Sequence, residues 1–437
     1  MIWPTKKLGE ICEKIKAGGT PSRKNPKYWD GEIPFIKIED ITSTKLYLEN
    51  TQEKITQEGL NNSNAWILPP NSILFSIYAS IGEVAINKVP VATNQAILGL
   101  IPKKSIIDFK FLAYALKKFG KYLISYNIQS TQKNLTLEIV KNLEIPLPPL
   151  PIQQKIVKVL DTIQEAIEIQ EKIIEKTKEL KKSLMNLLFH YGIKALSIKL
   201  LTSYRVSELN SSRVGELKSE ELEKLELKLK KTEVGEIPEH WDVGRLREVI
   251  EKPQYGITTK AINEDTGVKF LRITDIQDEK VNWNSLPFSK CTEEELNKYG
   301  IKEKDIVVAR IGATTGKSFF VNSTLKCVFG SYLIRIRAKS NLYPDFLNYY
   351  FQSTLYWSQL NLAKGEKLKG GINIPVLENL KIPLPPLPEQ QEIAEILQTI
   401  DQKIEIEKRK KELYEELFKT MLNKIMSQEI DINLLNY

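Results

Sequence analysis

Leu143 to Ile163 reads LEIPLPPLPIQQKIVKVLDTI, and Leu380 to Ile400 reads LKIPLPPLPEQQEIAEILQTI. The two stretches lie 237 positions apart without a gap, and 14 of their 21 residues are identical. Internal similarity of this length predicts that the chain is built from two similar halves.

Each stretch begins as a proline-rich strip and continues as a helix. Proline fixes φ and donates no backbone hydrogen bond, so Pro146 to Pro151 and Pro383 to Pro388 are predicted to be extended and stiff. The last proline of each strip suits the first turn of a helix. A polyproline ligand for a partner domain is the alternative, but repetition at a junction favours a structural role.

The residues after each strip have the pattern of a long amphipathic helix. Apolar side chains recur mostly three, four or seven positions apart, separated mainly by Lys, Glu and Gln. Helices of this length need a packing partner, and the repeat predicts that the two pack antiparallel on each other. The apolar positions are Ile156, Leu160, Ile163, Ile167, Ile174, Leu180, Leu184 and Leu187, then Ile393, Leu397, Ile400, Ile404, Leu417 and Ile425.

A larger block precedes each strip and contains short runs of β-branched and aromatic residues bounded by turn-forming residues. Such runs predict strands at Ile33 to Ile38, Ser72 to Tyr78, Val84 to Asn87, Val268 to Ile273, Asp305 to Arg310 and Ser318 to Val321. Short motifs also match between the blocks: Ile38-Glu39-Asp40-Ile41 with Ile273-Thr274-Asp275-Ile276, Ile81-Gly82-Glu83 with Ile311-Gly312-Ala313, and Lys141-Asn142-Leu143 with Glu378-Asn379-Leu380.

These patterns predict an α+β fold: two globular α/β domains separated by two long helices packed as an antiparallel coiled coil, with a pseudo-two-fold internal repeat. The predicted parts are a first block (1–150), a central helix (151–192), a helical connector with a helical stretch near Leu217 to Leu229 (193–236), a second block (237–388) and a distal helix (389–437).

The positive charge is concentrated in the two blocks. The chain carries a net charge of +8, of which residues 1–150 contribute +6 and residues 238–388 contribute +4. A polyanion such as DNA would be attracted to the blocks. The three widely spaced cysteines and the lack of an apolar span or leader predict a cytoplasmic protein.

No convincing catalytic centre is found in the sequence. Gly312 to Ser318 resembles a phosphate-binding loop, but it is one residue short and a strand-like run follows where a helix is required. A tight strand–turn–strand is the better interpretation. The two histidines have no ligand partners at metal-binding spacing, so neither metal nor cofactor is expected.

Turns rich in basic, hydroxyl and amide side chains occur at matching places in both blocks. Such side chains suit phosphates and base edges, so we predict that they bind DNA. The candidates are Thr20, Ser22, Arg23, Lys24, Tyr28, Gln129, Ser130, Thr131, Gln132, Lys133 and Asn134 in the first block, and Tyr255, Thr258, Thr259, Lys260, Lys364, Lys367 and Lys369 in the second.

This organisation resembles the specificity subunit of a type I restriction–modification system. The main carriers of the resemblance are the junctions Ile145 to Gln154 and Ile382 to Gln391. The segments Thr5 to Glu10, Ile237 to Trp241, Thr93-Asn94-Gln95 and Thr131 to Leu135 are also typical. The second block departs from the pattern, because Phe329-Gly330-Ser331 stands where the first has Thr93-Asn94-Gln95.

The resemblance implies a non-catalytic subunit whose blocks are target recognition domains. Each would read one half of a split, asymmetric sequence in double-stranded DNA, while the helices fix the gap. The implied partners are two methyltransferase subunits docked on the helices and a motor–endonuclease subunit, which would carry out catalysis. The alternatives are a coiled-coil scaffold whose blocks bind protein, and an NTPase that uses Gly312 to Ser318.

Overall fold

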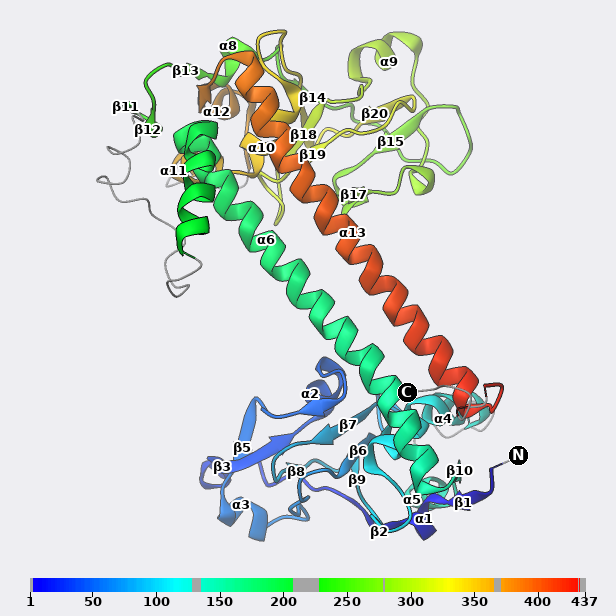
Figure 1. Ribbon diagram of the computed structural model, residues 1–437. Helices are drawn as coiled ribbons and strands as arrows, with labels where there is room; N and C mark the ends of the chain where they lie inside the picture. Colours follow the sequence, from blue (N-terminus) through cyan, green and yellow to red (C-terminus); the bar gives the residue numbers. More distant parts are fainter. Residues whose placement is uncertain are drawn as a thin grey trace. The chain divides into compact units, whose positions relative to one another are not determined.

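A computed structural model describes residues 3–127, 135–206, 228–277, 280–364, 371–430 and 432. The chain forms two compact units. Unit 1 contains residues 1–171 and 409–437, and unit 2 contains residues 172–408. Each unit holds one block together with a part of each long helix (Figure 1).

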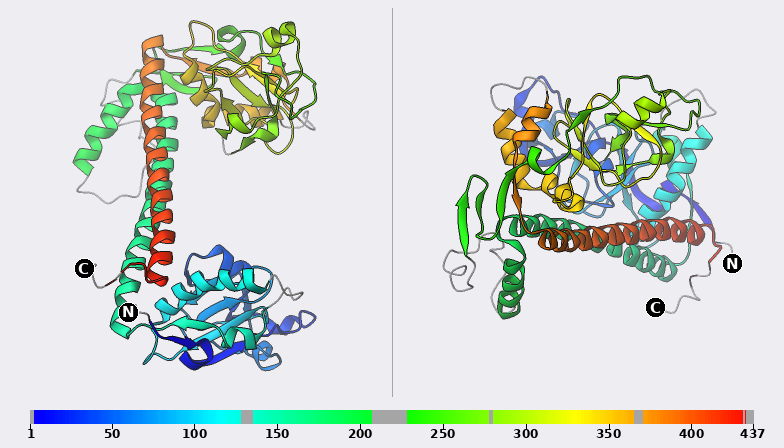
Figure 2. Two further views of the ribbon diagram at one scale, coloured as in Figure 1. Left: turned by 90° about the vertical axis from the view of Figure 1, so that its right-hand side faces the viewer. Right: turned by 90° about the horizontal axis from the view of Figure 1, so that it is seen from above.

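Unit 1 is built on a five-stranded sheet in the order β2 (Cys12–Ala17), β9 (Ile97–Pro102), β6 (Ile73–Ser76), β7 (Val84–Asn87) and β4 (Tyr47–Leu48), in which only β4 and β7 are parallel neighbours. Every residue of β6 and β7 is buried, because both faces of the sheet are covered. The helix α4 (Phe109–Asn127) packs against β6 and β7 (Figures 1 and 2). Ile73 and Phe75 belong to the core shared with α4 and the long helices, whereas Leu74 and Ala85 belong to a smaller cluster near β3 (Trp29–Ile36).

The elements of the first block are β1 (Thr5–Lys7), α1 (Leu8–Ile11), β2 (Cys12–Ala17), η1 (Pro26–Tyr28), β3 (Trp29–Ile36), α2 (Ile38–Ser43), β4 (Tyr47–Leu48), β5 (Glu53–Ile55), α3 (Gln57–Asn61), β6 (Ile73–Ser76), β7 (Val84–Asn87), β8 (Ala92–Thr93), β9 (Ile97–Pro102), α4 (Phe109–Asn127), α5 (Leu137–Lys141) and β10 (Glu144–Pro146).

Unit 2 contains an antiparallel four-stranded sheet, β14-β21-β18-β19, and a parallel pair, β15 and β20. Its elements outside the long helices are β11 (Leu229–Thr232), β12 (Gly235–Pro238), β13 (Asp242–Arg245), α8 (Leu246–Val249), β14 (Gln254–Tyr255), β15 (Lys269–Leu271), η2 (Ile273–Asp275), β16 (Ile276–Gln277), β17 (Lys280–Val281), η3 (Trp283–Ser285), α9 (Glu293–Tyr299), β18 (Ile306–Ala309), β19 (Ser318–Phe320), β20 (Cys327–Phe329), β21 (Leu333–Ile336), α10 (Pro344–Gln352), α11 (Thr354–Lys364), α12 (Ile374–Asn379) and β22 (Lys381–Leu384).

All six predicted strands are confirmed, with ends that differ by a few residues. The predicted strand Ile33 to Ile38 stops at Ile36, because Ile38 begins α2. The Asp of the matching motif explains this boundary in both blocks. Asp40 Oδ2 accepts a hydrogen bond from the Lys37 backbone N–H at 2.8 Å, and Asp275 Oδ2 accepts one from Arg272 at 2.8 Å.

The predicted match of Asn142 with Asn379 is confirmed, but the predicted match of Gly82 with Gly312 is wrong. Asn142 Oδ1 accepts from Lys7 Nζ, and Asn379 Oδ1 accepts from Arg245 Nη1, both at 3.1 Å. The turn between the central strands aligns differently from the prediction. The Gly82 N–H donates to Ser76, and the Gly316 N–H donates to Ala309, so Gly82 matches Gly316 and not Gly312. The second block has one extra residue in this turn.

Each proline-rich strip begins as a strand that pairs with the first strand of its own block, as the prediction of an extended strip requires, but its last two residues, Leu150-Pro151 and Leu387-Pro388, already belong to the following helix. β10 pairs with β1 and β22 pairs with β13, both antiparallel. The helices α6 (Leu150–Val206) and α13 (Leu387–Met426) then begin, with Pro151 and Pro388 as their second residues. The predicted place of the last proline is therefore confirmed.

The first glutamine of each Gln-Gln pair fastens the helix to its block. Gln153 Oε1 accepts from the Asp108 N–H at 2.8 Å, while Gln153 Nε2 donates to the carbonyls of Pro148 at 2.8 Å and Ile106 at 3.1 Å. Gln390 accepts from the Tyr343 N–H at 2.8 Å and donates to Pro385 at 2.9 Å and Asn341 at 3.4 Å. Both side chains are buried, and the oxygen and the nitrogen of each amide are hydrogen-bonded.

The long helices pack antiparallel within each unit. In unit 1, Glu171 of α6 pairs with Lys411 of α13, and earlier residues of α6 share a core with Leu422 to Met426. In unit 2, Lys181 pairs with Asp401, while later residues of α6 share a core with Ile393 and Leu397. Gly192, at φ 68° and ψ −170°, interrupts the helical conformation of α6.

Two of the apolar positions that were predicted to face the partner helix, and so to form an apolar seam, are exposed instead. Leu180 is 49% exposed and Leu417 is 43% exposed, whereas Ile156, Leu160, Ile393 and Leu397 are fully buried. Leu180 and Leu417 occupy equivalent positions 237 residues apart, so the departure is itself repeated.

Part of the predicted helical connector is a β-hairpin. β11 and β12 pair antiparallel, and the turn between them uses Gly235 at φ 103°, a conformation that glycine adopts easily. Most of the predicted helical stretch Leu217 to Leu229 lies outside the described residues.

Candidate nucleic-acid interface

The first predicted DNA-binding turn of block 1 lies on the surface before β3. Ser22, Arg23 and Lys24 are exposed, and Tyr28 is half-buried. Thr20 Oγ1 donates to Gln95 Oε1 at 2.6 Å, and the Trp29 indole N–H donates to the Ser22 carbonyl at 3.2 Å. The turn is therefore tied to both β3 and the segment after β8, while its basic residues face solvent.

Arg23 is held in a fixed position by two contacts. Its guanidinium lies 3.7 Å from the centroid of the Trp29 ring and 2.6 Å from Glu53. Lys37 contacts the other oxygen of Glu53 at 2.8 Å. Desolvation alone would raise the pKa of Glu53, but hydrogen bonds and charge from Arg23 and Lys37 hold the pKa below its ordinary value. Two cations thus share one carboxylate, which leaves the cluster positive.

The second predicted turn of block 1 comprises Gln129, Ser130, Thr131, Gln132, Lys133 and Asn134, which lie outside the described residues. The residue that follows can be placed. The Leu135 N–H donates to the Ile77 carbonyl at 3.3 Å, just after β6. In block 2, the Ile372 N–H donates to the Arg310 carbonyl at 2.7 Å, just after β18. The predicted turns therefore end at equivalent places in the two blocks.

Block 2 brings only some of its predicted residues together. Tyr255 lies in β14, and its hydroxyl accepts from the Ile374 N–H at 3.1 Å. Thr259 accepts from the Ser289 hydroxyl at 3.4 Å, and Thr258 and Lys260 are exposed nearby in sequence. Lys364 is the last residue of α11, whereas Lys367 and Lys369 lie outside the described residues.

Arg310 was missed by the sequence analysis. Its guanidinium lies 4.6 Å from the centroid of the Tyr255 ring, and Nη1 donates to the Ser331 carbonyl at 3.4 Å. Among the described residues, Arg310 Nε is buried without a hydrogen-bond partner. Tyr332 beside it is 55% exposed. The available signal was a basic residue at the end of an otherwise apolar strand, Ile306 to Ala309.

Gly312 to Ser318 forms the tight turn between β18 and β19, as predicted. These strands are antiparallel, and no helix follows the turn, so it lacks the helix N-terminus of a phosphate-binding loop. Among the described residues, no three His, Cys, Asp or Glu side chains gather as a metal site would require. In the same part of the chain, we find no helix with the length and apolarity needed to cross a membrane.

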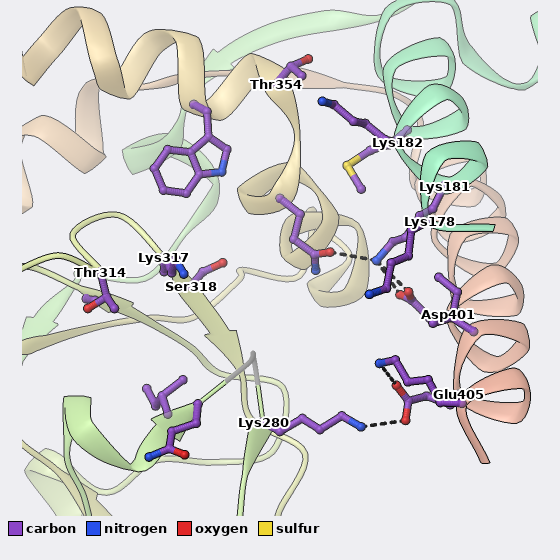
Figure 3. Close-up of a pocket in the computed structure, with 18 of the residues that line it drawn as sticks. Lys178, Lys181, Lys182, Lys280, Thr314, Lys317, Ser318, Thr354, Asp401 and Glu405 are labelled. Atoms are coloured by element: carbon purple, nitrogen blue, oxygen red, sulfur yellow. Dashed lines mark hydrogen bonds and ion pairs between the residues drawn. The ribbon is translucent and has the colours of Figure 1, made fainter. Parts of the chain in front are cut away.

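A large cleft in unit 2 lies between block 2 and the long helices (Figure 3). Its volume is about 1360 Å³, and six lysines line it: Lys178, Lys181 and Lys182 on α6, Lys280 and Lys317 on block 2, and Lys408 on α13. Asp401 and Glu405 on α13 also line it, together with Thr314, Ser318 and Thr354. We call this the lysine cleft.

Carboxylates neutralise only part of the charge of the lysine cleft. Lys181 contacts Asp401 at 2.7 Å, and Glu405 contacts Lys280 at 2.7 Å and Lys408 at 2.6 Å. Hydrogen bonds from Lys280 and Lys408 lower the pKa of Glu405, which is therefore ionised at neutral pH. Among the described residues that line the cleft, six lysines stand against two carboxylates, which leaves this part of the lining basic.

Comparison with known proteins identifies the two halves. The family model described as type I restriction modification DNA specificity domain matches residues 2–181 and 238–416. The type I restriction enzyme MjaVIII specificity subunit of Methanocaldococcus jannaschii is 28% identical over 444 residues, covering 100% of this chain and 94% of the relative. The putative MjaX specificity subunit of the same organism is 29% identical over 452 residues, covering 98% and 94%.

Solved structures share the fold. The S subunit of a type I restriction–modification system from M. genitalium superposes with a TM-score of 0.52 at 15% identity, covering 97% of this chain and 95% of that one. A chain from a study of complex assembly and conformational transition of the type I R-M system gives 0.56 at 18% identity, covering 97% of each. The family model matches most of the chain, in two copies that coincide with the internal repeat. The chain therefore belongs to the type I restriction–modification DNA specificity family, as a specificity subunit with two target recognition domains.

Proposed function

We propose that this subunit directs its complex to a bipartite, asymmetric DNA sequence, with one half-site read by residues 1–150 and the other by residues 237–388. One observation carries the proposal: the blocks share equivalent hydrogen bonds at the Asp and Asn motifs and at the buried glutamines, whereas the side chains displayed on their surfaces differ. Block 1 displays Arg23 stacked on Trp29, and block 2 displays Arg310 stacked on Tyr255. Similar scaffolds with different displayed side chains suit the reading of two different base sequences.

The proposed base and phosphate contacts come from the turns predicted above. In block 1 they are Thr20, Ser22, Arg23, Lys24, Tyr28 and residues 129–134, and in block 2 they are Tyr255, Thr258, Thr259, Lys260, Lys364, Lys367 and Lys369, to which we add Arg310. The contact with Tyr255 and the hydrogen bond to Ser331 restrain Arg310, so little rotamer freedom is given up on binding. A fixed guanidinium suits the two acceptors on the major-groove edge of guanine.

The helical segments, residues 151–192 and 389–437, are proposed to set the distance between the half-sites and to dock two methyltransferase subunits. Exposed apolar side chains support the docking. Ile169 and Ile406 are 58% and 53% exposed, and Leu180 and Leu417 are 49% and 43% exposed. Each pair is separated by 237 positions, so each unit carries one Ile and one Leu of the set. Two equivalent apolar surfaces suit two copies of one partner.

Catalysis is assigned to the methyltransferase and motor–endonuclease subunits, and the action of the complex on cellular DNA places the subunit in the cytoplasm. The connecting segment, residues 193–236, joins the halves.

Footprinting of the complex reconstituted with methyltransferase subunits tests the proposal. The expected result is two protected half-sites separated by a fixed unprotected gap. Exchange of residues 1–143 for those of a relative should change one half-site and leave the other intact. A single contiguous site, or a change in both half-sites, would contradict the proposal.

A further inference from the structure

We propose that the lysine cleft binds the phosphate backbone of DNA. The cleft lies beside the second recognition domain, and the equivalent positions beside the first domain do not carry the same charges. The inference rests on the proposed function and adds to it an unequal division of phosphate contacts between the halves. The ligand class is the sugar–phosphate backbone, which a positive surface binds without reading sequence.

Three of the six lysines are free to bind an anion. Lys181, Lys280 and Lys408 contact Asp401 or Glu405. Lys178, Lys182 and Lys317 are exposed, and among the described residues none of them has a carboxylate partner. In Figure 3, Lys178 and Lys182 extend from α6 on one side of the cleft, and Lys317 lies on the opposite side. Thr314, Ser318 and Thr354 add hydroxyl groups that suit phosphate oxygens.

The shape of the cleft favours a polymer over a small anion. Its volume of about 1360 Å³ exceeds that of a usual small-molecule site, roughly 300–1,000 Å³. The free lysines stand on two walls of this space instead of converging on one point. A backbone that carries a charge at every nucleotide can satisfy lysines spread in this way.

The cleft adjoins the proposed base-reading surface of block 2. Ala309 lines the cleft, and Arg310, the next residue, stacks on Tyr255. The turn that starts after Arg310 supplies Thr314, Lys317 and Ser318 to the cleft. Arg310 and the free Lys317 therefore stand at the two ends of one turn, where the Ala309 N–H donates to the Lys317 carbonyl at 2.9 Å.

The equivalent positions of the first half carry a different charge. In the 237-residue repeat, Glu415 corresponds to Lys178, Phe418 corresponds to Lys181 and Lys419 corresponds to Lys182. When the hairpin β6–β7 is aligned with β18–β19, Glu83 corresponds to Lys317. Two of the three free lysines thus become acidic, which would repel a phosphate. The contact of block 1 with its helix is retained, because Lys45 pairs with Glu171 as Lys280 pairs with Glu405.

The test compares two triple variants of the full chain in complex with its methyltransferase subunits. One is Lys178→Ala, Lys182→Ala and Lys317→Ala. The matched control is Lys158→Ala, Lys172→Ala and Lys326→Ala, which removes the same charge from exposed positions outside the cleft. The measurement is Kd for a duplex that contains the methylated sequence, between 50 and 200 mM salt, a range over which phosphate contacts alter affinity strongly.

In the cleft variant, the slope of log K against log salt should fall by about 0.9 for each phosphate that the substituted lysines no longer neutralise. The three substitutions together should lower the slope by up to about 2.7. The control variant should keep the wild-type slope. Neutral methylphosphonates on the second half-site side should weaken wild-type binding and have no further effect on the cleft variant. The sequence methylated should stay the same in both variants.

An unchanged salt slope in the cleft variant would overturn the proposal. A second result would also overturn it: calorimetry shows that ATP or an acidic peptide binds the wild type but not the cleft variant, while the two bind DNA with the same affinity. The failure of every form of the complex, wild type included, to bind DNA would instead contradict the proposed function, so the two failures can be told apart.

Discussion

Gln153 and Gln390 hold each long helix to its block through a single buried amide. The amide uses its oxygen for one backbone N–H and its nitrogen for two carbonyls, one of which belongs to the proline-rich strip. No other side chain of this size offers an acceptor and two donors in that arrangement. The neighbouring glutamines, Gln154 and Gln391, are exposed.

Replacement of Gln153 by Ala should therefore destabilise unit 1, because three hydrogen bonds are removed and their buried or partly buried partners are left unsatisfied. We expect the free energy of unfolding to fall by about 2–4 kcal/mol. Calorimetry of the full chain would detect it as a lowered transition temperature, and hydrogen exchange would show faster exchange at Asp108. Gln154→Ala is the matched control and should have little effect. Equal effects of the two variants would contradict the role of the buried amide.

The stacking of Arg310 on Tyr255 leads to a prediction about specificity. Arg310→Ala should relax recognition at one guanine of the second half-site, at a cost of about 1–3 kcal/mol, because the variant cannot form the bidentate hydrogen bonds. Arg310→Lys should restore the positive charge but not the two parallel N–H donors of a guanidinium, so it should rescue little of the specificity. Methylation mapping of the reconstituted complex measures both. An unchanged motif, or relaxed specificity in the first half-site, would count against the assignment.

At the scale of elements, the long helices can be lengthened without altering either block. Glu165 to Glu171 in α6 and Gln402 to Lys408 in α13 are equivalent heptads, 237 positions apart. Duplication of both heptads preserves the faces of the helices, because seven residues complete nearly two turns. The added length is about 10 Å, close to three base pairs of B-DNA.

The double duplication should therefore lengthen the gap in the recognised sequence by about three base pairs and leave both half-sites unchanged, as sequencing of methylated sites would reveal. Duplication in α6 alone is the control. It should shift pairs such as Lys181 with Asp401 out of register and lower the stability. An unchanged gap in the double duplication would contradict the spacing role of the helices.

The elements that could be predicted from the sequence are those whose signals are local. The six strands follow from runs of β-branched residues, and the strips follow from the fixed φ of proline. The exposure of Leu180 and Leu417 could not be predicted, because their spacing fits the seam and only the packing of the pair decides which face is covered. The hairpin β11–β12 was missed because its charged sequence, Leu229 to Thr232, carries no apolar alternation.

The candidate site was predicted less completely than the fold. The turn Thr20 to Asn25 could be found because its basic and hydroxyl residues are adjacent in sequence. Arg310 could not, because its contact with Tyr255 joins distant strands. The lysine cleft draws residues from both long helices and from several segments of block 2, so no single stretch of sequence reveals it.

At the scale of the whole molecule, the proposed docking surfaces are two, one in each unit, and each contains one Ile and one Leu of the repeated set. In unit 1 the surface comprises Ile169 of α6 and Leu417 of α13, and in unit 2 it comprises Leu180 of α6 and Ile406 of α13. Exposed apolar side chains that recur in this way on polar helices mark protein interaction sites more often than isolated ones do.

Substitution of these residues by Glu should remove methyltransferase subunits one at a time. Ile169→Glu with Leu417→Glu alters unit 1 only, and Leu180→Glu with Ile406→Glu alters unit 2 only. Each pair should cost at least about 3 kcal/mol, since two apolar side chains are no longer buried, and thus more than 100-fold in Kd. Native mass spectrometry should find one methyltransferase subunit on either double variant and none on the quadruple variant. Leu362→Glu, at a position that is 82% exposed outside the long helices, should retain both. Because the two surfaces are equivalent, the double variants should lose a subunit to the same extent, and two bound subunits on a folded quadruple variant would rule these surfaces out as the docking sites.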